Sequence, residues 1–131
     1  MPEKSAIIGL HEAGEGMIFS LESMLGRRGY REIVTVKTPL EMDEKCSTRD
    51  YNLYIMDVNL GFPNGYDFSC ANRVYGRIKL KVDAGEIKFY PLAAFDDVVD
   101  AARRAGLPAL SKRDFDERFE ELLGPIERSQ N

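Results

Sequence analysis

An apolar run ends in a carboxylate within the segment Tyr51-Asn52-Leu53-Tyr54-Ile55-Met56-Asp57-Val58-Asn59-Leu60. Tyr54, Ile55 and Met56 are consecutive apolar residues without alternation, which is typical of a central parallel strand covered on both faces. Asp57 therefore falls at the carboxyl edge of the predicted sheet, which is where open α/β sheets bind their ligands.

The length and composition predict one globular domain. The chain has 131 residues, of which 44% are apolar and 31% are charged, so it can bury one hydrophobic core. We therefore expect a single domain over residues 1–131. No apolar run approaches the ~20 residues that span a bilayer, and the first residues do not form a secretory signal. The expected compartment is the cytoplasm, without a membrane partner.

Charge and cysteine content argue against two further classes of site. The net charge is −4, and basic residues are interspersed with acidic ones, which argues against a nucleic-acid surface. Cys46 and Cys70 lack the spacing of a metal or redox motif. We expect both to be reduced, partly buried thiols.

Strand and helix signals alternate along the chain. Thr38, Pro39 and Glu41 form the clearest helix start, because threonine can cap, proline suits the first helical position and glutamate completes a capping box. Besides the opening stretch, strands are expected at residues 5–10, 32–37, 87–92 and 109–111, and helices at about 18–28, 38–47, 68–82, 96–105 and 115–123.

The segment 78–85 is open to two interpretations. Ile78, Leu80 and Val82 alternate with lysines in the manner of a strand, and Gly85 could close a hairpin. The apolar stripe that begins at Phe68 instead favours one long helix through this segment, which is the interpretation we adopt.

The alternation of five strands with five helices predicts a parallel sheet with right-handed crossovers and helices on both faces. The expected fold class is α/β, a flavodoxin-like (βα)5 three-layer sandwich with strand order 2-1-3-4-5. In that order the first and third strands are neighbours, so the loop with Glu12 meets the strand end with Asp57. Lys112 follows the fifth strand and reaches the same edge. The sequence thus predicts a charged site there.

This pattern resembles the receiver (CheY-like) domain of two-component response regulators over nearly the whole chain. The strongest match is Ile55-Met56-Asp57-Val58-Asn59-Leu60, with Gly65 eight residues after the aspartate. The resemblance implies that Asp57 is the phosphoacceptor and that Lys112 pairs with the phosphoryl group. The expected function is phosphorelay signal transduction by a phosphoprotein that is not an enzyme. A sensor histidine kinase or phosphotransfer protein would be the donor, and a downstream protein would receive the output.

The resemblance also implies a magnesium ion, because phosphoryl transfer needs charge neutralised on the phosphoryl oxygens. Its expected ligands are Glu12, Asp57 and the backbone carbonyl of Asn59, since Mg²⁺ prefers oxygen. Glu15 is a substitute for a second acid after the first strand. His11 is the only histidine, and we expect it to be a neighbour of the site rather than a metal ligand.

The sequence departs from the family pattern at several positions, including the acid pair, which is reduced to Glu12, and the proline after the lysine, which is Arg113. The hydroxyl residue that ends the fourth strand in the family aligns with Ala93, and the aromatic switch residue of the fifth strand aligns with Ala109. Two functions therefore stay open: a phosphoacceptor receiver, and a pseudo-receiver that acts as a phosphorylation-independent protein-interaction module. A flavin or nucleotide binder is a weaker alternative, because no phosphate-cradling loop is present. By analogy with the family, a homodimer would form through the fourth helix, fifth strand and fifth helix.

Overall fold

The computed structural model describes residues 4–11, 15–62 and 65–126. Its strands form one parallel sheet of order β2-β1-β3-β4-β5, which is the predicted order. The strands are β1 Lys4–Gly9, β2 Tyr30–Val36, β3 Leu53–Asp57, β4 Lys88–Ala93 and β5 Leu110–Ser111. The helices are α1 Glu15–Gly26, α2 Pro39–Thr48, α3 Ser69–Asp83, α4 Asp96–Arg104, α5 Lys112–Glu117 and α6 Phe119–Leu123.

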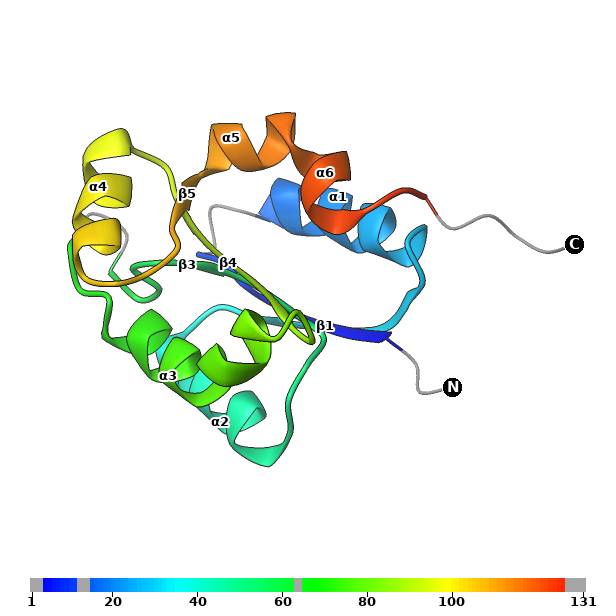
Figure 1. Ribbon diagram of the computed structural model, residues 1–131, viewed down its shortest axis with the longest axis horizontal. Helices are drawn as coiled ribbons and strands as arrows, with labels where there is room; N and C mark the ends of the chain where they lie inside the picture. The colour runs from blue at the N-terminus through cyan, green and yellow to red at the C-terminus, as the bar shows by residue number, and fades with distance from the viewer. Residues whose placement is uncertain (1–3, 12–14, 63–64, 127–131) are drawn as a thin grey trace, which may run out of the picture.

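The helices cover both faces of the sheet (Figure 1). Residues of α2, α3 and α4 share one buried apolar cluster, whereas residues of α1, α5 and α6 share a second one. Side chains of β3 alternate between the two clusters: Tyr54 and Met56 face the first, and Leu53 and Ile55 face the second. The predicted burial of this strand on both faces is confirmed, because all five of its residues are buried.

The capping signals place α2 where the sequence predicts it. The Thr38 side chain accepts a hydrogen bond of 3.1 Å from the backbone N–H of Glu41, and Pro39 begins the helix. The Glu41 carboxylate in turn accepts from the Thr38 hydroxyl and from the backbone N–H of Lys37. These contacts satisfy donors that a helix N-terminus leaves without an intrahelical partner.

The segment 78–82 is the end of the long helix α3, as favoured above. Ile78 is buried and Val82 is half-buried, while Leu80 points outward with 85% of its surface exposed. Residues four apart share one helix face, so the pair Ile78 and Val82 fits a helix as well as a strand. The exposed Leu80 is what produces the strand-like alternation.

The fourth strand accommodates Pro91 because its pairing is uneven. β3 pairs along β4 from Lys88 to Leu92, but β5 pairs only with Leu92 and Ala93. The ladder on the β5 side therefore begins after the proline, which lacks a backbone donor.

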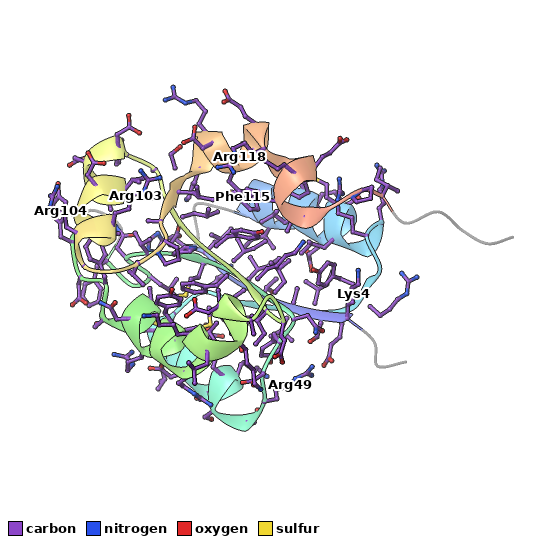
Figure 2. The ribbon with its side chains drawn as sticks, viewed as in Figure 1. Lys4, Arg49, Arg103, Arg104, Phe115 and Arg118 are labelled. Carbon is purple, nitrogen blue, oxygen red and sulfur yellow. The ribbon has the colours of Figure 1, made fainter. Side chains whose placement is uncertain are left out.

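The final helix is interrupted, contrary to the prediction of one continuous helix. α5 ends at Glu117, and Arg118 leaves helical geometry with φ −107° and ψ 20° before α6 begins. Phe115 and Phe119 nevertheless pack together in the core with ring centroids 5.3 Å apart. Figure 2 shows Phe115 beneath α5, facing the sheet, whereas Arg49 and Arg104 lie at the periphery. The apolar spacing thus correctly predicts which residues are buried but not the break.

Within the described ranges, no helix is long and apolar enough to cross a membrane.

Candidate functional site

Asp57 lies at the centre of the candidate site. It is the last residue of β3, and only 2% of its surface is exposed. The following residue is anchored to the neighbouring strand, because the Val58 backbone N–H donates to the carbonyl of Leu92 over 2.8 Å. A carboxylate this deeply buried needs charged or hydrogen-bonding partners, and both of its oxygens have them.

Lys112 is the first partner. Its ammonium nitrogen Nζ lies 3.0 Å from Asp57 Oδ1, and its side chain is 30% exposed. The short strand β5 and the helix cap after it fix the position of the lysine. The Ser111 hydroxyl accepts a 3.0 Å hydrogen bond from the Asp114 backbone N–H, so α5 begins at Lys112. The predicted convergence of Asp57 and Lys112 is confirmed.

His11 is the second partner, and it contacts the other carboxylate oxygen twice. Its backbone N–H donates to Asp57 Oδ2 over 2.9 Å, and its ring nitrogen Nδ1 lies 2.9 Å from the same oxygen. The chain reaches this position two residues after the end of β1, which pairs with β3. Each oxygen of Asp57 is therefore held by a nitrogen from a neighbouring segment.

The far side of the His11 ring contacts the loop after β3. Nε2 accepts a hydrogen bond of 3.2 Å from the Gly61 backbone N–H and lies 3.1 Å from the carbonyl oxygen of Asn59. The contact with Gly61 requires an unprotonated Nε2, so the ring proton then lies on Nδ1 and points at Asp57. A ring protonated on both nitrogens would donate to Asn59 instead and would keep the bond to Asp57.

Local turns hold this loop against the ring. The Leu60 N–H donates to the Asp57 carbonyl, the Phe62 N–H donates to the Asn59 carbonyl, and the buried Asn59 side chain donates to the Gly65 carbonyl over 3.0 Å. Gly61 has φ +91°, and a Cβ added there would meet Pro39 Cγ at 2.7 Å. Glycine at this position thus allows the backbone to bring its N–H to His11.

The predicted metal ligands are only partly described. Asp57 and the Asn59 carbonyl do lie on the same side of the site, but His11 contacts both of them. Glu12 falls outside the described residues, as does the side chain of Glu15. Among described residues there is no group of three or more His, Cys, Asp or Glu side chains that could hold a metal ion. With His11 in this position, the described residues do not fit Mg²⁺.

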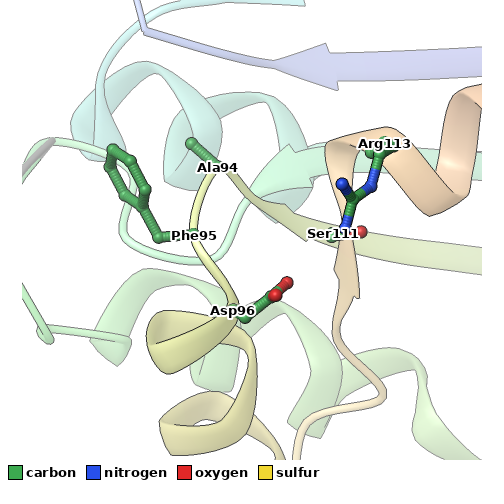
Figure 3. Close-up of a pocket in the computed structure, with 5 residues that line it drawn as sticks. All are labelled: Ala94, Phe95, Asp96, Ser111 and Arg113. Atoms are coloured by element: carbon green, nitrogen blue, oxygen red, sulfur yellow. The ribbon is translucent and has the colours of Figure 1, made fainter.

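The positions of the two absent switch residues are closely packed. Ala93 and Ala109 are 3% and 2% exposed, and neither carries a hydroxyl or an aromatic ring. Beside them, a recess of about 260 Å³ opens between the start of α4 and the start of α5. Figure 3 shows that the Asp96 and Arg113 side chains both reach into this region; its lining residues are Ala94, Phe95, Asp96, Ser111 and Arg113.

Comparison with solved structures identifies the fold. The chain is similar to the receiver domain of the sensor histidine kinase PA1611 from Pseudomonas aeruginosa PAO1, with a TM-score of 0.59 and 18% identity over 95% of this chain and 100% of that one. The chain has the receiver-domain fold. That P. aeruginosa structure has a magnesium ion coordinated in its active-site cleft.

A second receiver domain shows the same likeness. The signal receiver domain of an HD domain-containing protein from Pseudomonas fluorescens Pf-5 matches with a TM-score of 0.57 and 14% identity, over 92% of this chain and 94% of that one. No protein-family model and no curated protein matches the chain. At these identities the likeness concerns the receiver fold alone.

One residue of this site makes more contacts than the sequence predicts. The sequence predicts His11 as a neighbour, whereas the structure places the residue in direct contact with Asp57, Asn59 and Gly61. A signal is present in the sequence, because the chain's single histidine directly follows the strand beside the acid.

Proposed function

We propose that the chain is a receiver module of two-component signalling that accepts a phosphoryl group on Asp57. The observation that carries this proposal is the buried carboxylate of Asp57 at the end of the central strand, with Lys112 Nζ 3.0 Å from Oδ1. The receiver fold supports the same function. In this proposal the chain is a phosphoacceptor, not an enzyme that acts on a separate substrate.

The proposed chemistry is nucleophilic substitution at phosphorus. A carboxylate oxygen of Asp57 attacks the phosphohistidine of a kinase or phosphotransfer protein. A P–O bond forms as the P–N bond breaks, and the departing imidazole keeps the bonding electron pair and takes up a proton from solvent. Lys112 and His11 contact the carboxylate and are both partly exposed, so their side chains separate it from solvent.

Lys112 suits the role of cation in this transfer. An ammonium group is a compact point charge that can follow a phosphoryl oxygen as it forms its bond to the acid. The proposed partners are a sensor histidine kinase or phosphotransfer protein upstream and a protein that reads the modified surface downstream. Magnesium dependence, which the resemblance implies, is opposed by the contacts of His11.

A second candidate function is favoured by a different observation. Oδ2 of Asp57 already receives two donors from His11, and Ala93 offers no hydroxyl to a phosphoryl group. Such a site fits a pseudo-receiver that binds a protein partner without phosphorylation. The electrostatic role of Asp57 would then be to hold Lys112 and His11 in place.

Acetyl phosphate distinguishes the two functions. The protein is incubated with this donor, with and without Mg²⁺, and its intact mass is measured beside that of Asp57→Asn. A gain of one phosphoryl group in the wild type that is absent from Asp57→Asn supports the phosphoacceptor. If the mass does not increase under either condition, and beryllofluoride leaves the near-UV circular dichroism spectrum unchanged, the phosphoacceptor function is contradicted. The protein-interaction module is then the remaining candidate.

A further inference from the structure

The imidazole of His11 lies between two of the three groups expected to bind magnesium, the Asp57 carboxylate and the Asn59 carbonyl. Nδ1 is 2.9 Å from Asp57 Oδ2, and Nε2 is 3.1 Å from the carbonyl oxygen of Asn59. We propose that the His11 side chain occupies the place of the divalent cation and excludes Mg²⁺ from the Asp57 carboxylate. This inference concerns the proposed phosphoacceptor site, but it is independent of whether Asp57 accepts a phosphoryl group.

Coordination geometry makes the ring and the ion mutually exclusive. Mg²⁺ requires near-octahedral oxygen ligands at about 2.0–2.1 Å and retains several waters. The His11 ring contacts both Oδ2 and the Asn59 carbonyl, so it occupies the space from which such an ion would bind them. Imidazole is also a poor substitute ligand, because it suits zinc, copper, nickel and iron better than magnesium.

The ring is fixed by contacts from both sides of the site. The backbone N–H of His11 donates to the same carboxylate that its Nδ1 contacts, and the Gly61 N–H donates to Nε2. The side chain of His11 is only 18% exposed. To admit a metal, the ring must therefore break its bonds to Asp57 and Gly61 at the same time.

The charge balance of the site also disfavours a metal. Lys112 Nζ lies 3.0 Å from Oδ1, so the carboxylate already has one cation beside it. Oδ2 accepts from the backbone and from the ring of His11. Side chains of the protein thus already do what an ion would do: they neutralise the acid and link it to the loop after β3.

Manganese binding tests this proposal directly. Mn²⁺ resembles Mg²⁺ in its preference for carboxylate and carbonyl oxygens, and its free form is quantified by electron paramagnetic resonance. Wild type, His11→Ala and the double variant His11→Ala/Asp57→Asn are titrated with Mn²⁺ at one fixed pH, without any phosphoryl donor. We expect His11→Ala to bind at least about tenfold more tightly than wild type, and the double variant to lose this gain.

A second variant separates exclusion from misfolding. His11→Asn retains a side-chain N–H near the position of Nδ1 but lacks the far side of the ring, so it keeps a side-chain bond to Asp57 beside the backbone one and removes the contact with the Asn59 carbonyl. We expect its Mn²⁺ affinity to lie between those of wild type and His11→Ala, with a folded circular dichroism spectrum.

Equal Mn²⁺ affinity in wild type and both His11 variants would overturn the proposal, as would an affinity gain that survives Asp57→Asn. Because no phosphoryl donor is present, these results do not depend on phosphotransfer. A chain that takes no phosphoryl group from acetyl phosphate would still show the gain, so failure of the proposed function and failure of this inference are distinguishable.

Discussion

Lys112 Nζ lies 3.0 Å from Asp57 Oδ1, and this contact joins the start of α5 to the end of the central strand β3. The acid is 2% exposed and the lysine side chain 30% exposed, so water reaches the lysine but is largely excluded from the acid. Removing one partner of such a pair leaves a charge in a site that offers it little solvation.

Lys112→Ala should lower the free energy of unfolding by roughly 2 kcal/mol, less than for a fully buried pair because the lysine is partly exposed. Chemical denaturation of the wild type and the variant measures the difference. Adding Asp57→Asn to Lys112→Ala removes the uncompensated charge and should recover part of the loss. The two residues are not coupled if Asp57→Asn lowers the stability of Lys112→Ala by as much as it lowers the stability of the wild type.

Gly61→Ala should destabilise the protein by about 1–3 kcal/mol, because φ is +91° and the new Cβ would meet Pro39 Cγ at 2.7 Å. Gly76→Ala in α3 is the matched control, since nothing lies within 4 Å of the Cβ it adds. That change should stabilise the helix by about 0.5–1 kcal/mol. Thermal melts of both variants test the pair; equal shifts of the same sign would refute the strained backbone at Gly61.

Cys46 and Cys70 should react slowly with a thiol reagent in the native protein. Both are buried, and burial raises the pKa of each thiol to about 11, so few thiolates form near neutral pH. We expect Ellman's reagent to label both thiols rapidly only after denaturation. Fast labelling of the native protein at both positions would contradict their burial.

The same pKa shift has a consequence for stability at alkaline pH. The fold favours the neutral thiols, so their contribution is complete below the ordinary pKa near 9 and is lost as pH rises towards about 11. Cys46→Ala/Cys70→Ala should therefore show a smaller loss of stability between these pH values than the wild type. Denaturant titrations at several pH values measure the slopes, and equal slopes would show that other groups dominate.

The fold and the pairing of Asp57 with Lys112 can be predicted from local sequence patterns. The alternation of strand and helix signals predicts the parallel sheet and its order, and that order alone brings Asp57 and Lys112 to one edge. The uninterrupted apolar run before Asp57 predicts burial on both faces, which the structure confirms. These features depend on periodicity and topology, and both can be inferred from one sequence.

Contacts between loops cannot be inferred in this way. The position of the His11 ring depends on the backbone path after β1 and on the turn at Gly61, whose N–H reaches Nε2. No hydrophobic period encodes either path. The helix break at Arg118 is missed for a related reason, because the buried residues on either side keep helical spacing across it.

Trapping with borohydride shows whether Asp57 carries a phosphoryl group. Borohydride reduces an aspartyl phosphate to homoserine, which remains in the peptide after digestion and can be located by mass spectrometry. After incubation with acetyl phosphate, we expect homoserine at position 57, no homoserine at any other position, and none in Asp57→Asn. Unmodified aspartate at position 57, or homoserine only at another aspartate, would contradict phosphorylation of Asp57.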